Sequence, residues 1–172
     1  MSKVGGYQTR VLGTLSSATA GVIAAAGDYA ALDVMSNSAT AAAGVAWNFN
    51  NIGKTEGASG WIVGLKATAS AASMTTRLRL WLFHTTPTAS ELDDNAAFSL
   101  DADDRTKTVG YITLPALVDH GEVAYAQDFD IRVPFFCAVN DRDLYGILQT
   151  VDAETNEAAS MTVTLELSVV QD

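Results

Sequence analysis

The chain has 172 residues, 48% of them hydrophobic, which excludes a disordered protein and fits one folded domain. Its 20 Asp and Glu outnumber its 10 Lys and Arg, so ordinary binding to a nucleic-acid backbone is disfavoured. No apolar run is long enough to cross a membrane. We therefore expect a single domain over residues 1–172 that binds neither nucleic acid nor membrane.

The N-terminal part differs in amino-acid composition from the rest of the chain. Tyr7 to Leu15 alternates in polarity, which predicts a strand, whereas residues 13–44 are rich in Ala, Gly, Ser and Thr. Such small residues bury little area, so two alternatives stay open. Either residues 1–30 form an extended arm that adds as a strand to another chain, or the segment is an edge strand of its own sheet. A secretion signal is disfavoured because Gly13 and several hydroxyl residues interrupt the apolar stretch.

Alternation of apolar and polar residues with a period of two dominates the remainder. In one strand the second face also becomes apolar, at Trp81 and Phe83, which predicts that this face is covered at one end. The expected strands are Tyr7–Leu15, Tyr29–Met35, Val45–Phe49, Trp61–Ala67, Thr75–His84, Lys107–Leu114, Asp130–Val139, Leu144–Thr150 and Met161–Val169. The best helical candidate is short, Ser90–Phe98. Many short strands separated by turn residues predict an all-β fold, an antiparallel β-sandwich of jelly-roll type.

Residues suited to catalysis are few. The only imidazoles are His84 and His120, and neither belongs to a cluster with the ligand spacing of a zinc site. No nucleophile elbow of the G-x-S-x-G kind is present. We therefore expect no catalytic residue, no metal site and no cofactor, and a protein that is not an enzyme. Cys137, the single cysteine, lies in an apolar run and is expected to be buried and unreactive.

Two features have the residue types of a ligand site. The segment Asp93–Asp104 is acidic, but it lacks the glycine and the terminal Glu of a calcium-binding EF-hand loop. We expect a solvated loop with helix-capping aspartates and no functional calcium. Trp47, Trp61 and Trp81 could form a platform on which sugars stack. Because Trp61 and Trp81 lie in strong strand patterns, we expect these two to pack in the core or at a subunit interface instead.

Three passages from about Gly60 onward resemble a family of small structural proteins of tailed-bacteriophage particles. They are Leu82–Thr88, then Asp94–Phe98 with Asp101–Asp104 and Val109–Ile112, and finally Leu144–Leu148 with Val169–Asp172. Similar phage proteins decorate or cement the capsid. The resemblance thus implies a β-sandwich or jelly-roll fold and a homo-oligomer, a dimer or a trimer, that binds the major capsid protein.

The same resemblance implies a location on the outer capsid surface of the virion, after synthesis in the host cytoplasm. Its motifs are strand ends and turns, so no catalytic residue follows from them. The alternative function is a carbohydrate- or receptor-binding jelly-roll module of a phage tail or fibre.

Overall fold

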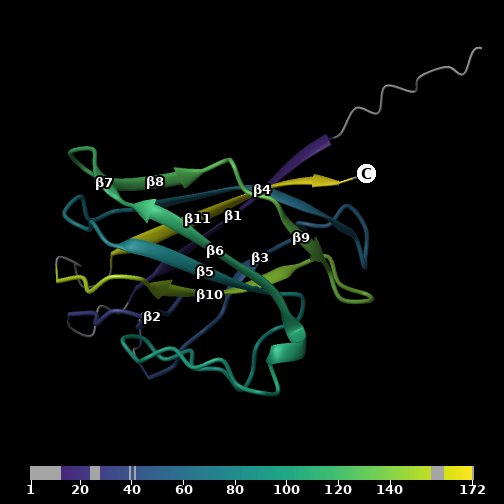
Figure 1. Ribbon diagram of the computed structural model, residues 1–172, viewed down its shortest axis with the longest axis horizontal. Coiled ribbons are helices and arrows are strands. Elements are labelled where there is room, and N and C mark those ends of the chain that lie inside the picture. Colours follow the sequence, from purple (N-terminus) through teal and green to yellow (C-terminus); the bar gives the residue numbers. More distant parts are fainter. Residues whose placement is uncertain (1–12, 24–27, 39, 41, 156–160, 172) are drawn as a thin grey trace, which may run out of the picture.

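Two antiparallel β-sheets face each other in the computed structural model, which describes residues 13–23, 28–38, 40, 42–155 and 161–171 (Figure 1). The strands are β1 (Gly13–Val22), β2 (Val34–Met35), β3 (Trp47–Phe49), β4 (Ser59–Ala69), β5 (Arg77–Phe83), β6 (Thr108–Ala116), β7 (Val118–Asp119), β8 (Ala124–Asp128), β9 (Val133–Phe136), β10 (Leu144–Thr150) and β11 (Thr162–Gln171). A single 3-10 turn, η1 (Arg105–Lys107), precedes β6 among the described residues.

The strands pair in a nested order. The six-stranded sheet has the order β1-β11-β4-β8-β7, with β9 also on β4, and the five-stranded sheet has the order β2-β10-β5-β6, with β3 also on β10. The first strand therefore pairs with the last, β2 and β3 pair with β10, β4 pairs with β8, and β5 pairs with β6. A chain doubled back on itself and wound into two sheets in this way is a jelly roll. The predicted fold class, an antiparallel jelly-roll β-sandwich, is confirmed.

The main core fills the space between the two sheets. Along β11 every second side chain is buried, and the polar side chains between them lie on the outer face. Alternate residues of β5 face it from the other sheet. The apolar residues that these two strands bury in the main core are Val163, Leu165, Leu167, Val169, Leu78, Leu80 and Leu82.

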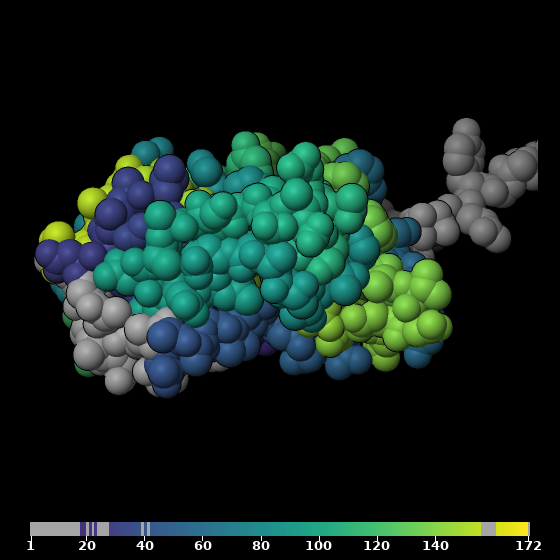
Figure 2. All heavy atoms as spheres, turned by 90° about the horizontal axis from the view of Figure 1, so that it is seen from below, coloured from purple at the N-terminus to yellow at the C-terminus, as the bar shows by residue number. Residues whose placement is uncertain are grey.

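A second, smaller cluster covers the outer face of the five-stranded sheet. Phe83 and Ile147 are buried there with Val34, and Trp81 and Phe98 pack against them. The long loop between β5 and β6 forms this cover, and Figure 2 shows the teal segment spread across the molecule. The coverage predicted from the apolar second face of β5 is therefore confirmed.

The predicted helix Ser90–Phe98 is wrong, because the structure has turns and loop there. Tertiary contacts replace helical hydrogen bonds: the Asp94 carboxylate accepts bonds from the Tyr29 hydroxyl and the Ser36 N–H. The apolar side chains of the segment pack onto the sheet below. Throughout the part of the chain that is described, no helix is long and apolar enough to cross a membrane.

The N-terminal segment supplies an edge strand. All ten residues of β1 pair with β11, so the edge-strand alternative holds for Gly13–Val22 and the arm is wrong for those residues. Most of the predicted strand Tyr7–Leu15, together with residues 1–12 and 24–27 of the expected arm, lies outside the described residues.

Candidate functional site

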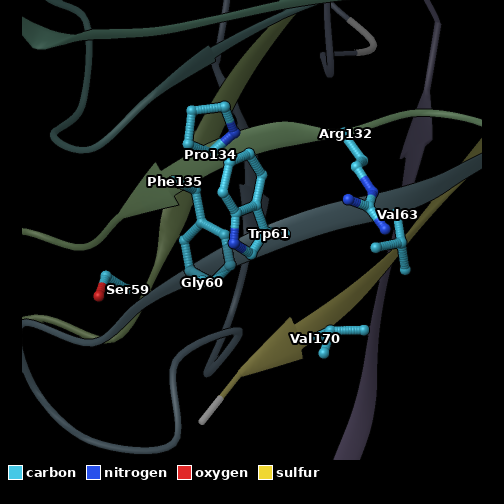
Figure 3. A pocket seen from close by; sticks show the side chains of 8 residues that line it. All are labelled: Ser59, Gly60, Trp61, Val63, Arg132, Pro134, Phe135 and Val170. Atoms are coloured by element: carbon cyan, nitrogen blue, oxygen red, sulfur yellow. The ribbon is translucent and has the colours of Figure 1, made fainter. Parts of the chain in front are cut away.

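An open groove of about 600 Å³ crosses the six-stranded sheet near the described ends of the chain (Figure 3). Three strands contribute to it: the first half of β4, the short strand β9 with the residue before it, and the end of β11. The residues that line it are Ser59, Gly60, Trp61, Val63, Arg132, Pro134, Phe135 and Val170.

The register of the sheet places an apolar row across the groove. Trp61 of β4 pairs with Val170 of β11 on one side and with Pro134 of β9 on the other. Residues that are opposite each other in neighbouring strands project from the same face, so these three side chains stand in line. Figure 3 shows the Trp61 ring next to Pro134. The Trp61 side chain is 50% exposed, so the row presents a large aromatic surface to solvent.

Two glycines of β4 shape this surface. A Cβ atom on Gly60 would lie 2.5 Å from the Val170 carbonyl oxygen, too close for any other residue. A Cβ atom on Gly64 would lie 2.2 Å from the Phe129 ring, so the lack of a side chain at Gly64 leaves room for that ring. Phe129 is nevertheless 54% exposed. It therefore adds an exposed aromatic ring next to Gly64 of β4, although it is not among the residues that line the groove.

The groove lining is suited to contact rather than to reaction. Its described residues provide one cation, Arg132, and one hydroxyl, Ser59, among apolar side chains and glycine. His84 lies elsewhere, with its ring 4.6 Å from that of Phe136, and His120 packs edge-on against Tyr125. Among the residues that the structure describes, no imidazole or carboxylate lines the groove to activate the hydroxyl. Exposed Trp and Arg side chains are the types that most often dominate binding at protein interfaces.

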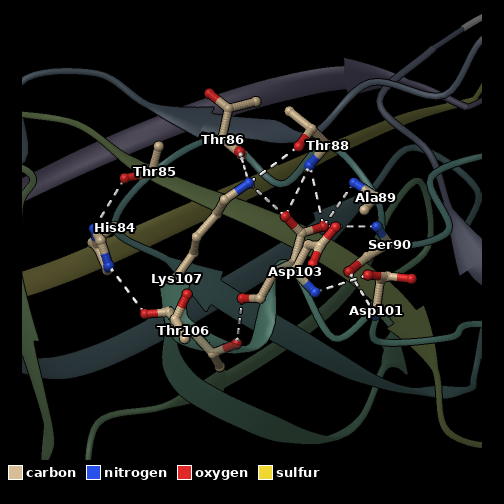
Figure 4. Close-up of polar contacts among 12 residues, drawn as sticks. His84, Thr85, Thr86, Thr88, Ala89, Ser90, Asp101, Asp103, Thr106 and Lys107 are labelled. Carbon is tan, nitrogen blue, oxygen red and sulfur yellow. Dashed lines mark hydrogen bonds and ion pairs between the residues drawn. The ribbon is translucent and has the colours of Figure 1, made fainter.

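The acidic segment organises the β5–β6 loop. The buried Asp104 carboxylate accepts hydrogen bonds from the backbone N–H groups of Thr88, Ala89 and Ser90 and pairs with the Lys107 ammonium at 2.7 Å. Figure 4 shows these donors converging from the loop and from η1, whose last residue is Lys107. Burial opposes ionisation, but the bonds from Lys107 and from the three N–H groups outweigh it and lower the pKa of Asp104 well below its usual range.

The other aspartates of this segment also hold the loop. Asp93 accepts the Gly44 N–H, and Asp101 accepts the Asp103 N–H. The expectation that these aspartates cap helices is wrong, because they bind turn and loop N–H groups. Among the described residues no group of three His, Cys, Asp or Glu is arranged to hold a metal ion. That the segment binds no functional calcium stays a prediction.

The three tryptophans do not meet. Trp47 is buried in the core, where its indole N–H donates to the Met35 carbonyl at 3.1 Å. Trp81 lies on the outer face of the five-stranded sheet against Phe98 and Tyr111. Only Trp61 lines the groove. A sugar platform built from all three rings is therefore wrong. The expected packing within the fold is confirmed for Trp81. Core packing is wrong for Trp61, which is half-exposed, and its packing at a subunit interface stays a prediction.

Cys137 is buried, as predicted, and its reactivity yields a test. Burial, and then the charges of Asp141 and Asp143, raise the pKa of the thiol from 9.0 to about 11, although Arg142 opposes this effect. Because the thiolate is the reactive form, we expect native protein at pH 8 to react with a disulfide reagent at least about a hundredfold more slowly than protein in denaturant. Equal rates in the two states, followed by absorbance of the released thiolate, would contradict this.

The groove itself was missed at the sequence level. Its residues come from three distant segments, and only the register of β4, β9 and β11 joins them. One signal was available. A proline inside a strand, Pro134, indicates a sheet edge, and glycines inside a strand, Gly60 and Gly64, indicate a close approach of neighbouring groups.

Comparison with known proteins adds little to this geometry. No family model and no curated protein matches the chain. Among solved structures, a chain of Desmodium yellow mottle tymovirus is similar at 10% identity, over 99% of this chain and 94% of that chain, with a TM-score of 0.27. A TM-score this low does not establish a shared fold, so the function has to be argued from the site.

Proposed function

We propose that this chain is a non-enzymatic structural protein of a virus particle, which decorates and stabilises a phage capsid by docking onto coat subunits through the Trp61 groove. The observation that carries the proposal is the row formed by Val170, Trp61 and Pro134, in which the Trp61 ring is half-exposed. Phe129, against Gly64 of β4, is a second exposed aromatic ring. As a homo-oligomer, the protein would bridge neighbouring coat subunits.

The physical basis is burial of apolar surface around one anchor. Phe129 and Trp61 are each half-exposed in the free protein, and a partner that covers them removes a large apolar area from water. Arg132 is a cation of the groove lining in a chain of net charge −10, and it would pair with a carboxylate of the partner. A central aromatic with an adjacent arginine has the composition of an interface hot spot.

Two weaker arguments support a capsid as the partner. The resemblance of Leu82–Thr88 and the later passages to phage structural proteins implies decoration of a shell. Jelly rolls are also a common architecture of viral capsid domains, and of lectins as well, which makes this support one of analogy.

The replacement Trp61→Ala tests the proposal. We expect it to weaken binding to shells that lack this protein by about 2 kcal/mol, or roughly thirtyfold in Kd, because the anchor is removed. Cosedimentation of purified protein with such shells measures the loss. Val118→Ala, at an equally exposed position on β7, is the matched control and should bind as the parent does. Unchanged binding by the Trp61 variant would refute the docking site.

A carbohydrate-binding function is the second candidate, because an exposed indole face beside a guanidinium also suits a sugar ring. A glycan array probed with the parent protein and with the Trp61→Ala variant separates the two functions. We expect no glycan signal. A signal that disappears in the variant would favour the carbohydrate-binding module of a tail or fibre.

A further inference from the structure

Strand β1 is a sheet edge without the usual protection. It pairs with β11 through all ten residues in an unbroken register. On its other side no strand pairs with it in the part of the chain that the structure describes. The sequence Gly13–Val22 has no charged residue and no proline. A long, regular and uncharged edge of this kind is a template for pairing with another strand.

The other edges of the sandwich are protected. Strands β2, β3 and β7 have only two or three residues each. Strand β9 has four residues, and one of them is Pro134. Strand β6 is long, but it carries Pro115 and its pairing with β5 is interrupted by register shifts. Short strands, prolines and bulges are the features by which proteins prevent edge pairing, so their absence from β1 distinguishes this edge.

The hydrogen bond at the end of β1 shows which backbone groups point to the open side. The Ile23 N–H donates to the Met161 carbonyl, so the backbone N–H and C=O of Ile23 point toward β11. In an antiparallel pair these directions alternate along the strand. The even-numbered residues from Thr14 to Val22 therefore direct their N–H and C=O groups away from β11. Ala18, whose side chain is exposed, lies in the middle of this series.

We propose that β1 pairs antiparallel with β1 of a second copy of this chain, about a two-fold axis at Ala18. In such a pair, residues whose backbone groups point away from β11 must lie opposite each other. An axis at Ala18 meets this condition and lets Thr14 to Val22 of both copies pair. Two copies that each carry a net charge of −10 repel each other, and a strip without charged residues is where that repulsion opposes contact least. This inference rests on the proposed function, for which it names the oligomer interface.

The geometry of this dimer suits attachment to a shell. A two-fold axis through an antiparallel pair is perpendicular to the sheet, so the outer faces of both six-stranded sheets lie on the same side. The two Trp61 grooves then point in the same direction. A dimer of this shape can bind two coat subunits of one shell at once, and bivalent attachment raises the overall affinity without any new contact.

A proline scan of β1 tests the interface. Ala18→Pro removes an N–H that points to the open edge and leaves the bonds to β11 in place. We expect the parent protein to be a dimer by sedimentation at high protein concentration, and the variant to be a monomer with a nearly unchanged Tm. Ala18→Ser keeps the N–H and should remain a dimer. Thr19→Pro removes an N–H that faces β11 and should lower the Tm instead. A monomeric parent, or a dimeric Ala18→Pro variant, overturns the proposal.

Cross-linking covers the case in which the proline variant does not fold. Residues that meet at the axis have Cα atoms about 5.5 Å apart, which is within the range of a disulfide. Under mild oxidation Ala18→Cys should therefore yield a covalent dimer, whereas Val118→Cys on the β7 edge should not. Failure of Ala18→Cys to cross-link, or equal cross-linking at both positions, counts against the interface. The Trp61→Ala variant should still be a dimer, so the docking site and the dimer can fail separately.

Discussion

Replacing Asp104 with asparagine is expected to lower the free energy of unfolding by roughly 3 kcal/mol. The buried carboxylate accepts the N–H groups of Thr88, Ala89 and Ser90 and the Lys107 ammonium. An amide has one oxygen, and its NH₂ group would face donors. The variant therefore leaves buried donors without a partner, and Lys107 without its counter-charge. Urea or guanidinium unfolding at pH 7 measures the difference.

The effect of Asp104 should depend on pH in a defined direction. Its folded pKa is lowered, so its stabilising contribution is complete above the ordinary carboxyl pKa of about 4 and is lost as the pH falls toward the folded pKa. The gap in stability between the parent and the variant should thus narrow below pH 4. Asp103→Asn, at an exposed neighbour, is the control and should stay within about 0.5 kcal/mol of the parent. A gap that is constant down to pH 2 would contradict this assignment.

Truncation of Trp47 to alanine should cost about 4 kcal/mol, the largest effect we expect from a single substitution. The ring is buried in the main core, and its N–H donates to the Met35 carbonyl. The tip of the ring also fills the space where Gly21 of β1 lacks a side chain. Removal of the ring leaves a cavity between the sheets and a buried carbonyl without its donor. A shift of the denaturant midpoint, with little change in the m-value, is the expected readout.

The matched comparison is Trp61→Ala in the same assay. This ring is half-exposed on an outer face, so its loss should change stability by less than about 1 kcal/mol. The two tryptophans should thus separate into one that supports the fold and one that supports binding. If Trp61→Ala is as destabilising as Trp47→Ala, the Trp61 ring is part of the fold and the docking site loses its anchor.

Strands with clear alternation could be predicted from the sequence, because one face of each is buried. Leu144–Thr150 was predicted to the residue, and Met161–Val169 nearly so. Strands β7 and β8 were missed, since Val118–Asp119 is very short and Ala124–Asp128 buries only small alanines that give a weak signal. The helix prediction for Ser90–Phe98 was wrong because the apolar residues of this segment pack on a sheet as part of a loop.

The candidate site could not be predicted for a different reason. Alternation tells which residues of a strand share a face, but not which strands are neighbours. Trp61 pairs with Pro134 and Val170, which lie far away along the chain, and that pairing depends on the whole jelly-roll topology. The sequence showed a tryptophan in a strand, whereas its exposure on an outer face required the register of three strands.

The nested pairing order has a consequence for synthesis on the ribosome. Of the described strands, β1 leaves the ribosome first and its partner β11 leaves last, so β1 stays unpaired with β11 until all the others have been made. Contacts this distant in sequence form slowly. During that interval both edges of β1 are open, and nascent chains on one polysome hold several such strands close together. Folding yield should therefore depend on translation rate and on chaperones that shield extended segments.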